Sequence, residues 1–117
     1  MSDLDDVREQ LREFVRERDW AQFHDPKNLV MALVSEAGEL AAELRWVKSD
    51  EADDACRAPE LRARVADEVA DVAICLVLLA DRLGLDLAGE MTRKIAKNRQ
   101  KYPADASRGR ALPPRGE

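Results

Sequence analysis

Two pairs of acidic residues stand inside apolar, helix-forming stretches of the sequence. Glu36 and Glu39 lie in LVMALVSEAGELAAEL, and Glu68 and Asp71 lie in VADEVADVAICLVLLA. A spacing of three residues places both side chains of a pair on one face of an α-helix, close enough to share a ligand. Four carboxylates converging from two helices would form a site of oxygen ligands only, which Mg²⁺ or Mn²⁺ prefers. All four are therefore candidate catalytic and metal-binding residues.

The alternative is that these carboxylates lie on the wet sides of amphipathic helices, where acidic residues usually occur. The continuation of the second stretch argues against this alternative. Residues 72–80, VAICLVLLA, are apolar on every side, and a helix of that kind is buried. Glu68 and Asp71 therefore lie in a helix whose continuation has little access to water. A carboxylate in such surroundings needs a partner or a cation.

Apolar periodicity and helix start and stop signals predict four helices that would position these residues. Their expected ranges are about 4–19, 26–46, 59–83 and 86–102. No strand is expected, and the acidic segment 48–58 lacks periodicity and is predicted to be a loop. The fold class is therefore all-α, a four-helix bundle with the third helix central.

The ends of these helices carry recognisable capping residues. Asp25 followed by Pro26 is a strong helix start, with Asp as the N-cap and Pro at the first helical position. Gly84 fits a left-handed cap after the third helix, and Asp86 is the expected N-cap of the fourth. The fourth helix must end before Pro103.

The apolar half of the third helix predicts self-association. One small bundle has too little surface to cover a stretch that is apolar all round. We therefore expect a homo-oligomer, a dimer or a tetramer, with this helix at the subunit interface.

Size and charge indicate one domain that handles small molecules. The 117 residues are 37% charged and 45% hydrophobic, and the net charge is −5. This composition suits a single helical domain and opposes binding to a nucleic-acid backbone. We assign residues 1–103 to the domain and expect the Pro-, Gly- and Arg-rich segment 104–117 to be a disordered tail.

Neither a membrane nor an oxidising compartment is indicated. The start of the sequence, MSDLDDVREQ, lacks the basic and apolar regions of a secretion signal, and the nine-residue apolar run is too short to cross a bilayer. Cys56 and Cys75 share no metal-ligand spacing, and Cys75 lies in the apolar run, where a free Cys behaves as a small hydrophobe. We expect a reduced, cytoplasmic protein.

Three segments of the sequence resemble the MazG-like nucleotide pyrophosphohydrolases, and in particular the dCTP pyrophosphatase type. They are RDWAQFHDPKNLVMALVSEAGELAAELRW, ADEVADVAICLVLLADRLGLDL and KIAKNRQKYP, and the resemblance extends over about residues 11–103. E-x-x-E and E-x-x-D stand on successive expected helices, between W-x-x-F-H and K-x-x-x-N-x-x-x-Y-P. The order of these motifs makes the resemblance specific.

The resemblance implies an activity and its metal centre. The activity is the Mg²⁺-dependent cleavage of a nucleoside triphosphate between its α and β phosphates, which gives a monophosphate and pyrophosphate. Family members assemble as dimers or tetramers. The metal-binding carboxylates of the family correspond to Glu36, Glu39, Glu68 and Asp71.

Two further groups of residues correspond to family positions that contact the substrate. Lys94 and Asn98, which share one helix face, match positions that meet the phosphates. The positions that line the base and sugar pocket of the dCTP type match Trp20, His24 and Trp46. Where some relatives have Tyr four residues after the acidic Asp, this chain has Cys75, so the choice between ribose and deoxyribose stays open.

Two other interpretations remain beside this one. The chain could act like phosphoribosyl-ATP pyrophosphohydrolase, or it could be a non-catalytic helical protein that binds a partner through a wet acidic face. The set Trp20, His24 and Trp46 favours a stacked pyrimidine over the first alternative. A di-iron oxidase is excluded because it needs Glu-x-x-His on two helices, and this chain has one His.

Overall fold

A computed structural model describes residues 2–111, and these residues form helices with no strand among them. The all-α prediction is therefore confirmed. The elements are α1 (Asp3–Glu17), η1 (Ala21–Phe23), α2 (Pro26–Leu44), η2 (Ser49–Glu51), α3 (Ala52–Ala55), α4 (Pro59–Arg82), α5 (Leu87–Lys101) and α6 (Ala104–Ser107). The chain divides into two compact units, Met1–Gly84 and Leu85–Glu117, which we describe separately.

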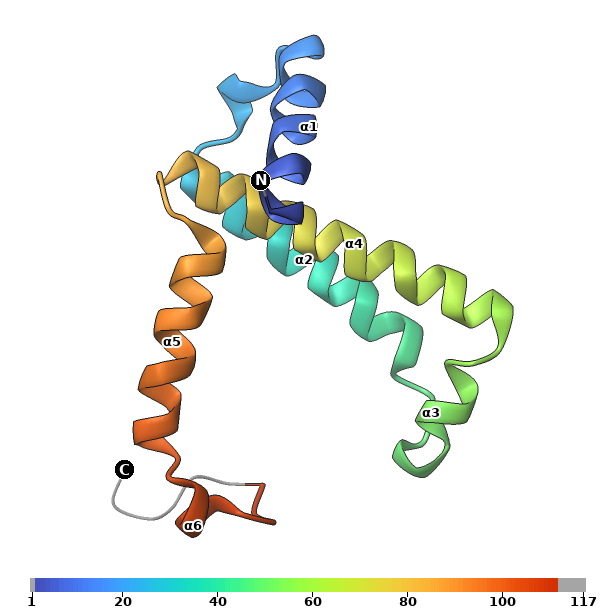
Figure 1. The fold of residues 1–117 in the computed structure, drawn as a ribbon. Coiled ribbons are helices and arrows are strands. Elements are labelled where there is room, and N and C mark those ends of the chain that lie inside the picture. The colour runs from blue at the N-terminus through green and yellow to red at the C-terminus, as the bar shows by residue number, and fades with distance from the viewer. Residues whose placement is uncertain (1, 112–117) are drawn as a thin grey trace. The chain divides into compact units, whose positions relative to one another are not determined.

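The first unit is built on α4. Helix α2 packs along α4, and the two helices run side by side in opposite directions (Figure 1). Helix α1 packs against α4 as well. The longest helix is therefore the central element of this unit, as predicted for the third of the four expected helices.

Local capping explains where α1 and α2 begin. The Ser2 hydroxyl accepts a hydrogen bond from the Asp5 amide at 3.2 Å, and the Asp5 carboxylate accepts one from the Ser2 amide at 3.3 Å. The Asp25 carboxylate accepts a hydrogen bond from the Asn28 amide at 2.9 Å, with Pro26 at the first helical position. The predicted start of α2 is confirmed.

Two residues with positive φ shape the connections. Gly84 has φ 69° directly after α4, which confirms the predicted left-handed cap. Asp19 has φ 53° between α1 and η1, a conformation that Asp tolerates better than most residues and that the sequence analysis did not foresee. Asp86 is the N-cap of α5, but its side chain makes no capping hydrogen bond.

One predicted loop is wrong in part. The segment 48–58 contains η2 and the single turn α3, because short helical turns form without apolar periodicity. Asp53 and Asp54 stand in the first turn of α3, where negative charge complements the helix dipole. In the expected tail, Ala104–Ser107 forms the short helix α6, and residues 112–117 lie outside the described residues.

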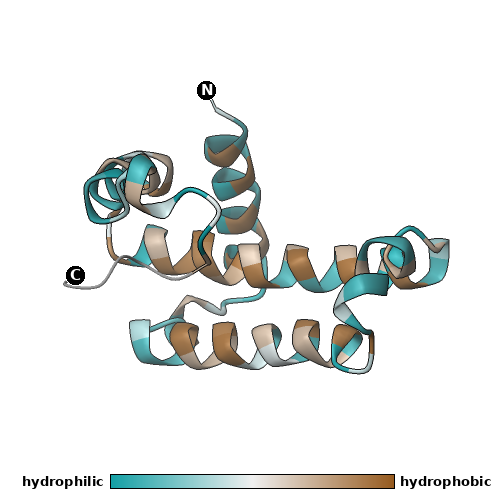
Figure 2. Ribbon diagram, turned by 90° about the horizontal axis from the view of Figure 1, so that it is seen from below, coloured by the Kyte–Doolittle hydropathy of each residue, from teal (hydrophilic) through white to brown (hydrophobic). Residues whose placement is uncertain are grey.

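The core of the first unit is thin. Its buried hydrophobic residues are Leu29, Cys75, Val77 and Ala80. Hydrophobic residues nevertheless occur along both α2 and α4 (Figure 2), and many of them are exposed, including Val34 and Val69. The prediction that residues 72–80 are buried all round holds for only part of that stretch, because Leu76 keeps 39% of its surface.

None of the helices in residues 2–111 has both the length and the apolarity needed to cross a membrane.

Candidate metal centre and adjoining pocket

The opposed packing of α2 and α4 brings acidic side chains from the two helices together. Glu36 and Glu39 come from α2, and Glu68 comes from α4. One carboxylate oxygen of each residue lies within 4.8 Å of those of the other two. This carboxylate cluster brings the first acidic pair together with one member of the second pair across the two helices.

The fourth predicted ligand, Asp71, stands next to the cluster but outside this set of three. Its charge still contributes to the raised pKa values of Glu36 and Glu68. Asp71 is exposed, and it also lines the pocket described below. The structure thus brings three of the four predicted ligands together and places the fourth between the cluster and a cavity.

Among residues 2–111, no Lys or Arg forms an ion pair with the three carboxylates of the cluster. The pKa of Glu36 is raised chiefly by a hydrogen bond shared with Glu39, and then by burial and by repulsion from the neighbouring carboxylates. The pKa of Glu68 is raised chiefly by burial, and then by Glu39. Both directions show that the folded protein disfavours full ionisation of the cluster in the absence of a cation.

The cluster also contains buried oxygens without partners. Oε2 of Glu36 and Oε2 of Glu68 are each buried, and neither accepts a hydrogen bond from residues 2–111. A buried carboxylate oxygen without a donor is costly unless something else binds it. An oxygen-only donor set with two such atoms fits a hard divalent cation such as Mg²⁺ or Mn²⁺.

An ion pair that the sequence did not predict lies one turn from the cluster on both helices. Nε of Arg64 donates to both carboxylate oxygens of Glu43, at 3.1 and 3.0 Å. Glu43 stands one turn after Glu39 on α2, and Arg64 stands one turn before Glu68 on α4. The i, i+4 spacing could have drawn attention to each residue, but their pairing depends on how the two helices pack.

A pocket of about 520 Å³ adjoins the cluster. It is lined by residues of α1, α4 and the segment that joins α1 to α2, namely Val7, Gln10, Leu11, Phe14, Trp20, His24, Asp71, Ile74 and Leu78. The rings of Phe14 and Trp20 meet edge to face, with centroids 5.7 Å apart and an interplanar angle of 75°. We call this cavity the aromatic pocket. Of the three residues predicted to line the base pocket, Trp20 and His24 therefore lie together in this cavity.

The third residue predicted for that pocket, Trp46, is elsewhere. Trp46 follows the end of α2, keeps 84% of its surface exposed and is not among the residues that line the aromatic pocket. The guanidinium of Arg45 lies over its ring, 4.9 Å from the centroid. Within one chain, Trp46 cannot form a pocket with Trp20 and His24.

Lys94 and Asn98 lie one turn apart on α5, in the second unit. Lys94 is exposed and Asn98 is half-buried. That Lys94 and Asn98 bind the phosphates of the substrate stays a prediction.

The fold and the site define an all-α protein in which two antiparallel helices carry the acidic motifs E-x-x-E and E-x-x-D. Comparisons with known proteins identify its family. Residues 32–111 match the MazG-like family, so the chain belongs to this family. The chain is 45% identical over 108 residues to dCTP pyrophosphatase 1 of Mus musculus, an alignment that covers 92% of this chain and 64% of that protein. It is 44% identical over 105 residues to dCTP pyrophosphatase 1 of Homo sapiens, with 90% and 62% covered.

The chain therefore spans just under two thirds of the length of these relatives. A solved structure is also similar, the crystal structure of a pyrophosphatase from Archaeoglobus fulgidus. It superimposes with a TM-score of 0.81 and 33% sequence identity, over 88% of this chain and 94% of that one. The helical architecture is thus shared along nearly the whole length of that protein.

Proposed function

We propose that this chain is a divalent-cation-dependent nucleoside triphosphate pyrophosphohydrolase. Its proposed substrate is dCTP or a related pyrimidine deoxynucleotide, which it would split into a monophosphate and pyrophosphate. The observation that carries the proposal is the carboxylate cluster with two partnerless buried oxygens, directly beside a pocket walled by aromatic rings. The names of the similar proteins support the same reaction.

The cluster is the proposed site of the cation. Glu36, Glu39 and Glu68 would hold Mg²⁺ or Mn²⁺, and Asp71 is the proposed fourth ligand at the edge of the aromatic pocket. When bound, the cation supplies charge neutralisation for the phosphates and lowers the pKa of the attacking water.

The remaining work falls to the side chains of the chain itself. Because Asp71 lines the pocket and its charge acts on Glu36, a nucleotide with its base in the pocket would have its phosphates near the carboxylates. Trp20 and Phe14 offer ring faces and edges for stacking, which tolerates any base. Selectivity for a pyrimidine would then come from the width of the pocket and from hydrogen bonds by His24.

The proposal has further parts, of which the assignments of substrate-binding residues rest on the family resemblance. Lys94 and Asn98 are the proposed phosphate-binding residues, and Trp46 is a proposed base-binding residue that another subunit would have to supply. The homo-oligomer this requires is supported by the exposed apolar residues of α2 and α4, among them Val34 and Val69. A cytoplasmic location is supported by the free thiols Cys56 and Cys75.

The test is a nucleotide panel assayed for pyrophosphate. We would compare dCTP, CTP, dTTP, dUTP and dATP with Mg²⁺ and with EDTA, using the wild type, Asp71→Asn and the exposed control Asp53→Asn. The proposal requires Mg²⁺-dependent release of pyrophosphate that is lost in Asp71→Asn and kept in the control. Full activity in EDTA, or no nucleotide cleaved at all, would overturn it, and equal rates for dATP and dCTP would refute the pyrimidine preference alone.

A further inference from the structure

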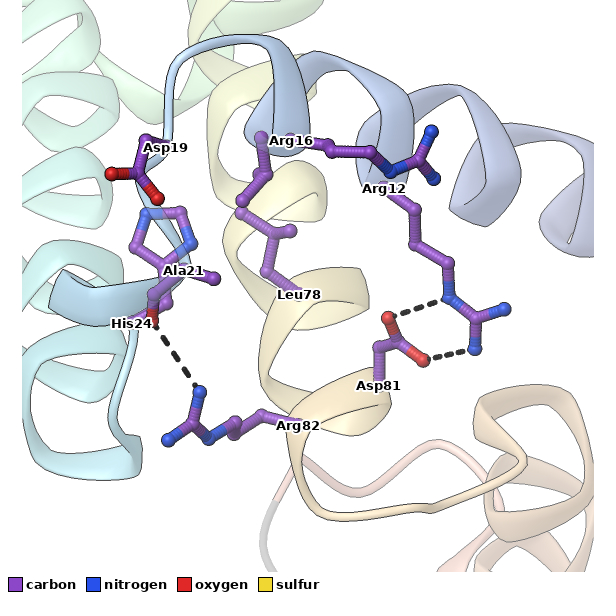
Figure 3. Close-up of a pocket in the computed structure, with 9 residues that line it drawn as sticks. Arg12, Arg16, Asp19, Ala21, His24, Leu78, Asp81 and Arg82 are labelled. Atoms are coloured by element: carbon purple, nitrogen blue, oxygen red, sulfur yellow. Dashed lines mark hydrogen bonds and ion pairs between the residues drawn. The ribbon is translucent and has the colours of Figure 1, made fainter.

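A second pocket, of about 410 Å³, lies against the C-terminal part of α4. Figure 3 shows most of its lining: two arginines come from α1, one arginine and one aspartate from the end of α4, and three residues from the segment that joins α1 to α2. The full set is Arg12, Val15, Arg16, Asp19, Ala21, His24, Leu78, Asp81 and Arg82. We call this cavity the arginine pocket.

The arginine pocket gathers guanidinium groups in a negative protein. Three guanidinium groups and two carboxylates line it, and Glu9, outside the lining, pairs with Arg12. The whole chain carries a net charge of −5. Guanidinium groups that have no carboxylate partner in a concave site of such a chain favour a negatively charged ligand.

Only one of the three arginines is fully paired. Nε and Nη2 of Arg12 donate to the two carboxylate oxygens of Asp81, at 2.9 and 2.5 Å, and Nη1 donates to Glu9 at 2.7 Å. This fork leaves Arg12 little capacity for a ligand. It fixes one side of the pocket by joining α1 to α4.

The other two arginines keep their charge unbalanced. Nη1 of Arg82 donates to the backbone carbonyl of Ala21 at 3.4 Å, a contact that directs the guanidinium along the pocket wall and neutralises nothing (Figure 3). Within residues 2–111, neither Arg16 nor Arg82 has a carboxylate within 4.0 Å of its guanidinium nitrogens. Both side chains are exposed and can turn toward a ligand.

We propose that the arginine pocket binds a phosphate group, with Arg16 and Arg82 as its ligands. The planar fork of a guanidinium matches the oxygens of a phosphate better than it matches a monovalent anion such as chloride. Val15, Ala21 and Leu78 line the same cavity, and its volume lies in the range of small-molecule sites. The ligand is therefore a small phosphate compound, either a nucleoside monophosphate or a free inorganic phosphate.

The arginine pocket shares residues with the aromatic pocket, so a ligand in one would affect binding in the other. His24 and Leu78 line both the arginine pocket and the aromatic pocket. A phosphate held by Arg16 and Arg82 would stand beside His24, so an occupied arginine pocket would change binding in the aromatic pocket. The site is separate from the carboxylate cluster, none of whose three residues lines it.

The test measures binding without turnover, so it does not depend on the proposed enzymatic activity. Inorganic phosphate and dCMP are titrated separately into the full chain by calorimetry, in EDTA and at constant ionic strength set with chloride. EDTA prevents a cation in the carboxylate cluster from attracting the anion. Binding in the wild type, weakened at least about tenfold in Arg16→Gln/Arg82→Gln, is the expected result.

The control is Arg57→Gln/Arg93→Gln, which also removes two positive charges. Arg57 and Arg93 are exposed and pair locally with Asp54 and Glu90, outside the pocket. The control must keep the affinity of the wild type, and circular dichroism must show that both double variants fold. If neither probe binds, or if both double variants lose affinity equally, the proposal is overturned. If dCMP binds more tightly than inorganic phosphate, the ligand is the nucleoside monophosphate. If the two affinities are equal, the pocket recognises the phosphate group and the ligand is inorganic phosphate.

Discussion

Helix α4 carries charge in two contrasting ways. In its first half, Glu68 joins Glu36 and Glu39 in a cluster of like charges with raised pKa values and buried oxygens that accept no hydrogen bond. In its last turn, Asp81 is held by both arms of the Arg12 fork, and its pKa is lowered by that hydrogen bond. The second arrangement pairs opposite charges within the chain, whereas the first holds like charges that a bound cation would stabilise.

A lowered pKa, as at Asp81, shows that the charged form is stabilised in the folded protein, and a raised pKa, as at Glu36 and Glu68, shows that it is disfavoured. We interpret the first arrangement as structural and the second as a site for a ligand. Each of the following variants tests one side of this contrast.

Glu39→Gln should have the largest effect. The substitution removes one of the three clustered carboxylates, so pyrophosphate release from dCTP with Mg²⁺ should fall at least about 100-fold, the upper end of what outer-shell changes cost a metal site. In EDTA the melting temperature should rise, because a repulsive charge has been removed. A variant that melts lower in EDTA and keeps its activity would contradict the functional interpretation of the cluster.

The aromatic pocket should come next. Trp20→Ala removes a ring that meets Phe14, and stacking of a base is worth roughly 1–3 kcal/mol, so KM for dCTP should rise roughly 5- to 150-fold. Trp46→Ala removes a ring that keeps 84% of its surface exposed and lies against the guanidinium of Arg45. A KM raised by this change as well would show that another subunit supplies Trp46, and an unchanged KM would remove Trp46 from the site.

The Arg12–Asp81 pair should matter for stability and not for catalysis. The folded-state pKa of Asp81 lies below its ordinary value, so the pair stabilises the fold fully above the ordinary pKa of about 3.9 and loses this contribution as the pH falls through the lowered value. Asp81→Asn should therefore melt a few degrees lower than the wild type at pH 7. The difference should shrink below pH 4, as followed by circular dichroism, and a constant difference at all pH values would refute it.

The smallest expected effects concern the pair beside the cluster, and their signs are opposite. Glu43→Gln removes a negative charge that acts on Glu68, so Mg²⁺ should bind roughly two- to fivefold more weakly. Arg64→Gln removes a positive charge one turn from Glu68, so Mg²⁺ should bind more tightly by a similar factor. Mg²⁺ titrations of the melting temperature measure both. If both variants bind more weakly, the pair acts by positioning the helices and not by its charge.

The sequence was most informative where the relevant geometry is local. The spacing in E-x-x-E and E-x-x-D fixes the face on which Glu36 and Glu39, or Glu68 and Asp71, must lie, whatever the rest of the chain does. The start of α2 at Asp25 and the cap at Gly84 depend on two or three residues each, and both were predicted correctly. The all-α class follows from the same periodicity.

It was least informative where packing decides. Arg12 and Asp81 are 69 residues apart, and no spacing rule joins them. The exclusion of Asp71 from the close set of carboxylates depends on the distance between two helices, which a face assignment does not give. Trp46 was placed with Trp20 on the family resemblance, which does not say whether one chain supplies both residues. Trp46 follows the end of a 19-residue helix and Trp20 precedes its start, so within one chain they do not line the same pocket.

The different surroundings of the two tryptophans have a spectroscopic consequence. Trp20 keeps 43% of its surface and packs against Phe14, whereas Trp46 keeps 84% and faces water. Their fluorescence should therefore differ in emission maximum and in quenching by acrylamide. With Trp46→Phe the remaining emission reports on the aromatic pocket, and with Trp20→Phe it reports on the end of α2. The chain thus contains two intrinsic optical probes, one for a ligand that enters the pocket and one for any surface that covers α2.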